Sequence, residues 1–185
     1  ESQRLMETGS GSQWEQTRHF MVVAFDLPMK DSVHLNQAGQ KELGRRIGLA
    51  TLEHVYGRSG VDGTGPRLLA ARPLVHPGGD KSKVLARFSR PVRETANDYD
   101  QLFRAFDSAG EITVTSARRD PANESAILLT LGRAGAGEVT VSYGDRPLNE
   151  AYLGEWLNGA VRGANESNLP APRFGPLPVV SGEAG

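Results

Sequence analysis

The sequence contains no cysteine, which excludes disulfides, thiolate metal sites and cysteine nucleophiles. Aromatic residues make up only 6% of its 185 residues, which indicates a core of small aliphatic side chains. Net charge is also nearly absent, since 21 Lys and Arg stand against 22 Asp and Glu. The longest apolar run, residues 20–25, is far shorter than the roughly 20 residues of a membrane-spanning helix. Charge and hydropathy therefore predict neither nucleic acid nor a membrane as a partner.

The four histidines do not form a metal-binding motif. They stand at positions 19, 34, 54 and 76, without HExxH or HxH spacing, so we expect no zinc centre made by this chain alone. Glycine and proline are plentiful, with 22 and 11 residues, and indicate many turns.

The first regular pattern is typical of a buried strand. It runs from His19 to Leu27, with five apolar residues in succession after Phe20. A fully buried strand needs parallel neighbours on both sides, and the sequence after it supplies none of that kind. No signal peptide is visible before it. The pattern therefore predicts that the chain begins in the middle of an α/β domain.

A helix is predicted after Pro28, which ends the strand. Asn36 is a good N-cap, and the helix continues to about Tyr56, where Gly57 stops it. Gly44 and Gly48 leave one face without side chains, so that face can approach a sheet closely. The residues expected on the solvated side are Lys41, Glu42, Arg45, Arg46 and Glu53.

The loop between strand and helix holds the candidate catalytic residues, Asp31 and His34. Open α/β folds place their sites at the carboxyl ends of strands, where this loop would lie. An Asp three residues before a His can accept from the imidazole Nδ1–H and leave Nε2 free to take a proton from a hydroxyl nucleophile. A surface turn is the alternative interpretation of such a pair.

Several motifs together resemble a known family. They are the run Val23–Leu27, the loop Asp31–Leu35, the stretch A-G-Q-K-E-L-G-R-R-I at 38–47, and two later segments, 139–144 and 168–174. This set resembles the last block of the SGNH (GDSL-like) hydrolases, and among them the sialate O-acetylesterases, which are carbohydrate esterases. The resemblance implies the end of a three-layer α/β/α domain in which Asp31 orients His34, and His34 acts as general base and then general acid. It implies no metal or organic cofactor, and a secreted, periplasmic or lysosomal location.

The nucleophilic serine of that family has no counterpart in this chain. There is no Gly-Asp-Ser-Leu motif, and Ser10 and Ser12 lie in a Gly-rich stretch that follows no strand. The resemblance therefore implies that the chain is the carboxyl-terminal part of a serine acetylesterase. Its partners would be an amino-terminal chain or segment that carries the serine, and an acetylated carbohydrate substrate.

The rest of the chain is predicted to be a separate β-rich domain. The expected division is an α/β part at 1–58, a linker at 59–66 and an antiparallel β-sandwich at 67–185, with a Pro-rich tail (170–178) as an extended strap over a neighbouring domain. The expected strands are 67–75, 83–88, 102–106, 111–117, 125–131 and 138–143. Tyr152 and Trp156 could fill a core edge or line a sugar-binding surface.

A second hypothesis comes from a different functional class. The chain could be a non-catalytic β-sandwich module that binds glycan or braces a partner chain. An exposed hydrophobic face on the helix would favour a partner chain, whereas a self-contained fold with Asp31 and His34 apart would favour an isolated module.

Overall fold

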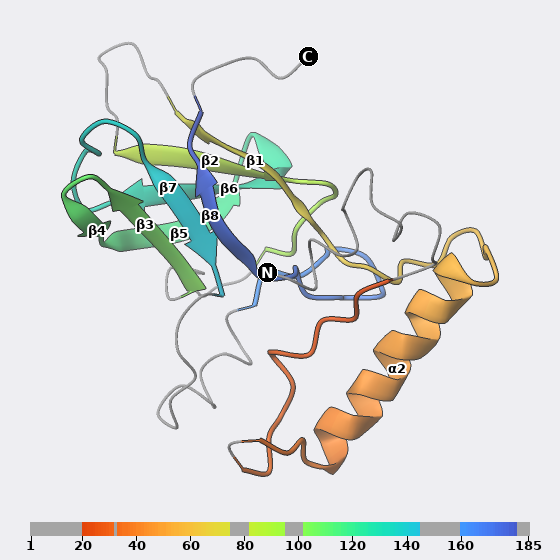
Figure 1. Ribbon diagram of the computed structural model, residues 1–185. Coiled ribbons are helices and arrows are strands. Elements are labelled where there is room, and N and C mark those ends of the chain that lie inside the picture. The colour runs from red at the N-terminus through yellow and green to blue at the C-terminus, as the bar shows by residue number, and fades with distance from the viewer. Residues whose placement is uncertain (1–19, 32, 75–81, 95–101, 145–159, 181–185) are drawn as a thin grey trace, which may run out of the picture.

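A computed structural model of the chain describes residues 20–31, 33–74, 82–94, 102–144 and 160–180 (Figure 1). The described residues contain one helix, α2 (Gln37–His54), and eight strands. The strands are β1 (Leu68–Pro73), β2 (Lys83–Phe88), β3 (Phe103–Asp107), β4 (Gly110–Ile112), β5 (Val114–Asp120), β6 (Asn123–Leu131), β7 (Thr140–Tyr143) and β8 (Phe174–Pro178).

The strands form two four-stranded sheets that pack on one core. The first sheet has the order β1-β2-β6-β5 and the second β4-β3-β7-β8, and every strand pair within them is antiparallel. Alternate residues of each strand point inward, as Val84 and Ala86 do in β2 and Val141 and Tyr143 do in β7. These inward side chains belong to a single hydrophobic cluster, so the sheets form a sandwich.

Most expected strands lie close to their predicted positions, but one is divided between the two sheets. The stretch 111–117 was expected as one strand, whereas Thr113 separates β4 from β5. Strand β4 pairs with β3 in the second sheet, and β5 pairs with β6 in the first. The alternation of apolar residues continues through the crossing, which is why the pattern alone does not reveal it.

The Pro-rich tail belongs to the sandwich itself. The strap expected over a neighbouring domain contains strand β8, which pairs with β7 at the edge of the second sheet. Proline donates no backbone hydrogen bond, so Pro176 and Pro178 suit an edge strand. Just beyond β8, Val179 bridges Ala71 of β1, and the chain thereby joins the edges of both sheets.

The predicted α/β/α architecture is wrong for the described residues. Residues 20–27, expected as a buried strand, form no strand, and no sheet of parallel strands lies anywhere in the described part of the chain. The segment is held by two different side chains. Phe25 packs against the sandwich core, where its ring meets that of Tyr143 edge-on, while the adjacent Asp26 is buried among arginines. An apolar run with one carboxylate therefore became a connecting segment rather than a central strand.

Helix α2 begins as its sequence predicts. The side-chain oxygen of Asn36 accepts a hydrogen bond of 2.9 Å from the backbone N–H of Gly39, which satisfies one of the free donors of the first turn. The helix stands to one side of the sandwich (Figure 1), and none of its residues belongs to the hydrophobic cluster of the described chain.

Candidate functional site

The loop that carries Asp31 and His34 is tightly closed. The backbone N–H of Lys30 donates to the carbonyl of His34 at 2.8 Å, and that of Asn36 donates to the carbonyl of Pro28 at 3.1 Å. A bridge between Met29 and Leu35 adds a further constraint. The loop ends at the first turn of α2, so the helix and the loop position each other.

Asp31 and His34 are in direct contact. Both carboxylate oxygens of Asp31 lie 2.9 Å from Nδ1 of His34, and Oδ1 also accepts from the backbone N–H groups of Val33 and His34. The N–H of Val33, followed by the His34 side chain, lowers the pKa of the Asp31 carboxyl below its usual range. Both side chains are exposed, at 71% for His34 and 47% for Asp31. Their geometry directs Nδ1 of the imidazole to Asp31, and no described residue binds Nε2.

The first turn of α2 lies directly against this loop. A Cβ atom on Gly39 would stand 2.4 Å from the carbonyl oxygen of Pro28, so only glycine permits this approach. The partly buried Leu35 lines the same contact.

The inner face of α2 contains a buried arginine. Arg46, which the sequence pattern placed on the solvated side, is only 2% exposed. Its guanidinium donates to both oxygens of Asp26, at 2.6 and 2.9 Å, and to the carbonyl of Val23 at 2.7 Å. Glu42 accepts a further hydrogen bond from Nε of Arg46. The prediction for Arg46 is therefore wrong, because a carboxylate from residues 20–27, that of Asp26, offsets the free-energy cost of burying the guanidinium.

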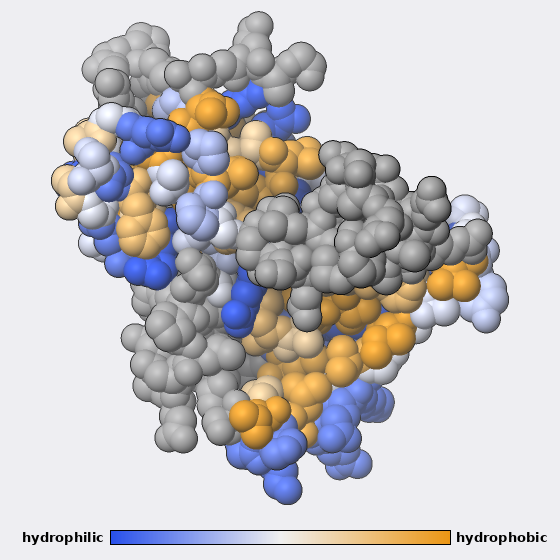
Figure 2. All heavy atoms as spheres, in the orientation of Figure 1, coloured by the Kyte–Doolittle hydropathy of each residue, from blue (hydrophilic) through white to orange (hydrophobic). Residues whose placement is uncertain are grey.

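The outer face of α2 is open and carries one exposed apolar side chain, Ile47. Ile47 is 45% exposed, and it lies between Gly44 and Gly48, where an added Cβ would meet no atom within 4 Å. Val55 and Tyr56 continue the exposed apolar surface past the end of the helix. Figure 2 shows hydrophobic surface gathered over the region of α2. The covered side of the helix also carries apolar residues, since Ala50 is fully buried and Leu43, Leu49 and Leu52 are half-buried, so Ile47 is the exposed exception within α2.

The charges around this open face that lack an ion-pair partner among the described residues have one sign. Every carboxylate of residues 20–66 has a cationic or hydrogen-bonding partner; these are Asp26, Asp31, Glu42, Glu53 and Asp62. Lys30, Lys41 and Arg58 are exposed, and none of them forms an ion pair with a described residue. The rim is therefore basic although the chain as a whole is nearly neutral.

Sequence reasoning identified Asp31 and His34 but missed the charged contact behind the helix. Asp26 stands in an otherwise apolar run, and a carboxylate in such a run needs a cationic partner if it is buried. That signal was available in the sequence, but it does not say which of the many arginines is the partner. Tyr152 and Trp156, the candidate sugar-stacking residues, lie outside the described residues.

No family model matches the chain, and neither does any curated protein. Among solved structures, it resembles the N-terminal part of the bacterial S-layer protein SbsC, with 15% identity over 59% of this chain and 24% of that one, at a TM-score of 0.36. A longer SbsC fragment gives 15% identity over 63% of this chain and 15% of that one, at 0.37. The chain thus spans less than a quarter of the length of these proteins, and scores this low do not establish a shared fold.

These findings correct the predicted family and activity. The SGNH resemblance requires a parallel α/β/α domain, whereas the described residues hold two antiparallel sheets and one helix. The prediction of a sialate O-acetylesterase, and of an ester hydrolase in general, is therefore wrong. The catalytic role of Asp31 and His34 stays a prediction, as does the domain division at 58 and 66.

No cluster of three metal-binding side chains occurs within the described ranges. No helix there is long and apolar enough to cross a membrane.

Proposed function

We propose that this chain is a protein-binding module, and that it docks a folded partner on the open face of α2. The observation that carries the proposal is the open face of α2, on which Ile47 is 45% exposed between Gly44 and Gly48. Burying apolar surface is worth about 25 cal/mol per Å², so an exposed Ile47, continued by Val55 and Tyr56, gives up free energy that a partner would recover.

The two glycines define the kind of surface that fits. With open space above Gly44 and Gly48, the backbone of a partner helix can approach α2 closely, and Ile47 between them supplies an apolar anchor. Gly44 and Gly48 each cost about 0.5–1 kcal/mol of helix stability relative to alanine. A role in docking would explain why glycine occupies both positions despite this loss of helix stability.

The rim charges define the partner further. Lys41 lies on the same side of α2 as Gly44 and Gly48, while Lys30 and Arg58 stand beyond the two ends of the helix. An apolar surface edged by Asp or Glu would pair with these cations and would be guided to the face by them. The sequence also predicted a protein partner, and the proposal keeps that prediction without specifying an esterase chain. No described residue bears on the expected carbohydrate.

The Asp31–His34 pair adds a directional polar contact at one end of the face. Because Asp31 holds Nδ1, the exposed Nε2 of His34 is oriented to hydrogen-bond a group of the partner.

Site-specific photo-crosslinking tests the proposal. A benzophenone amino acid at Ile47, in the chain expressed in its source cells, should give one dominant crosslinked protein. The crosslinked peptide should lie in an apolar patch edged by acidic residues. Ser108, in the exposed turn between β3 and β4, is the matched control position and should give no such product. A product from Ile47 that contains only a second copy of this chain, or diffuse products equal to those from Ser108, would overturn the proposal.

Charge reversal then tests the rim. Lys41→Glu should weaken crosslinking from Ile47 several-fold, since one exposed ion pair contributes about 0.2–1 kcal/mol and the reversal adds repulsion. Lys83→Glu at the start of β2 changes the net charge equally and should leave the yield unchanged.

A further inference from the structure

The contacts between α2 and the sandwich are mainly polar. The helical lobe, defined as the described residues of 28–61, is tied to the rest of the chain by Arg46, whose guanidinium reaches Asp26 and Val23. Arg45 adds an exposed hydrogen bond of 3.1 Å to the carbonyl of Ser167, and Glu53 accepts one of 2.8 Å from the backbone N–H of Gly63. No residue of α2 belongs to the hydrophobic cluster, and the apolar contacts of the lobe are local: Ala50 packs against Gly63, and Phe20 stacks on His54.

Asp26 is carried by the sandwich side of this junction. Its neighbour Phe25 packs on the sandwich core, where the Arg173 guanidinium lies 4.8 Å from the centre of its ring. The Asp26 carboxylate binds Arg46 of the lobe and also Arg162, at 2.5 Å, from the segment that precedes β8. Two guanidinium groups from opposite sides of the junction thus share one buried negative charge.

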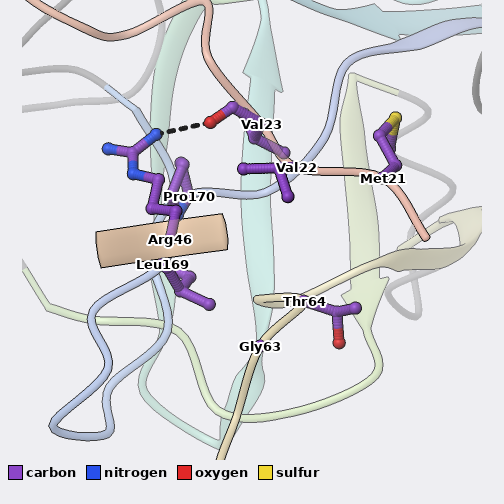
Figure 3. Close-up of a pocket in the computed structure, with 8 residues that line it drawn as sticks. All are labelled: Met21, Val22, Val23, Arg46, Gly63, Thr64, Leu169 and Pro170. Atoms are coloured by element: carbon purple, nitrogen blue, oxygen red, sulfur yellow. Dashed lines mark hydrogen bonds between the residues drawn. The ribbon is translucent and has the colours of Figure 1, made fainter. Parts of the chain in front are cut away.

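The junction also contains a small recess. It is open to solvent, has a volume of about 10 Å³, roughly the room for one water molecule, and lies beside Arg46. Figure 3 shows its lining, with Arg46 on one side and Leu169 and Pro170 close by, and the hydrogen bond from Arg46 to Val23.

We propose that the helical lobe opens from the sandwich as a unit, and that the Asp26 carboxylate is the latch that holds it closed. With Asp26 charged, both arginines are neutralised and the lobe is docked. Without that charge, Arg46 and Arg162 face each other as two cations with reduced solvation, and the closed state loses its main attraction and gains a repulsion. The latch also fixes the direction in which α2 presents its outer face, but it does not depend on what that face binds.

Hydrogen exchange of the whole chain, followed by mass spectrometry, tests the latch. Asp26→Asn should speed exchange of amides 43–50 by at least about a hundredfold, as expected for a broken buried ion pair, and should leave the amides of β6 within about twofold. Asp107→Asn is the matched control, because Asp107 also binds an arginine in two-pronged fashion, Arg133, but lies in the second sheet. It should leave amides 43–50 unchanged.

The wild-type chain provides a second measurement that needs no variant to fold. If the lobe opens alone, amides 43–50 exchange through an opening that exposes less surface, so their rates respond less to low denaturant than those of β6. Equal denaturant dependence in the two regions would overturn the proposal. An unchanged exchange rate of 43–50 in folded Asp26→Asn would overturn it as well.

Discussion

Asp26 and Arg46, twenty residues apart in the chain, form a two-pronged ion pair with both side chains buried. This pair holds Arg46 on the covered side of α2 and leaves Ile47, one position further along, exposed. The orientation of one helix therefore depends on a single carboxylate in an apolar run, and both the proposed docking and the proposed opening follow from it.

The glycines of the outer face should behave differently from a buried one. Gly48→Ala should stabilise the free chain by about 0.5–1 kcal/mol, because alanine is the better helix former and an added Cβ meets nothing. Gly63→Ala should destabilise it, because the Cβ would stand 2.5 Å from Cα of Ala50. Thermal unfolding followed by circular dichroism measures both. A stabilised Gly48→Ala that also binds its partner less well would assign that glycine to docking rather than to folding.

The hydroxyl of Tyr143 should add to the free energy of unfolding beyond what burial of its ring contributes. Its oxygen accepts a 2.8 Å hydrogen bond from the backbone N–H of Val161, and both residues are fully buried. Tyr143→Phe leaves that donor without a partner and should cost about 1–3 kcal/mol in urea unfolding. Tyr56→Phe, at a position 74% exposed, removes the same atom and should change stability by less than about 0.5 kcal/mol. Equal effects would contradict this account of the core.

Acid should weaken the helix through Glu42. Hydrogen bonds from Arg45 and then Arg46 lower the pKa of Glu42 from 4.5 to about 2. A carboxyl whose pKa is depressed by folding stabilises the folded state above its ordinary pKa, and that contribution is lost as pH falls toward the folded value. The stability difference between wild type and Glu42→Gln should therefore shrink between pH 4.5 and about 2. A difference that stays constant over this range, in helix ellipticity against urea, would contradict it.

The neutral imidazole of His34 should be fixed in one tautomer. When neutral, it should hold its proton on Nδ1, because that atom faces the Asp31 carboxylate. Two-bond ¹H–¹⁵N correlation spectra at a pH of about 9 distinguish the tautomers. Asp31→Ala should shift the population of His34 toward Nε2–H, while His54 in the same spectrum should not change. A wild-type ring already protonated on Nε2 would show that the contact does not persist in solution.

Local features of this chain were predictable because their causes are local. The N-cap at Asn36, the strand at 83–88 and the closeness of Asp31 to His34 all depend on residues within a few positions of one another. The predictions that were wrong concern partners distant in the chain. These are the parallel sheet expected around 19–27, the strap expected at 170–178 and the solvated position expected for Arg46.

The sequence by itself determined the near-neutral charge, the absence of thiol chemistry, the strand-and-turn pattern of the second part and the capped helix. Only the tertiary structure decided which face of α2 is covered. Hydrophobic periodicity ranks the two faces by the free energy of burying them, and on that scale the apolar face goes inward. A buried two-pronged pair with Asp26, from a segment fixed to the sandwich by Phe25, brings the charged Arg46 to the covered side together with Ala50. No pattern within the helix indicates that the carboxylate that pairs with Arg46 comes from another part of the chain.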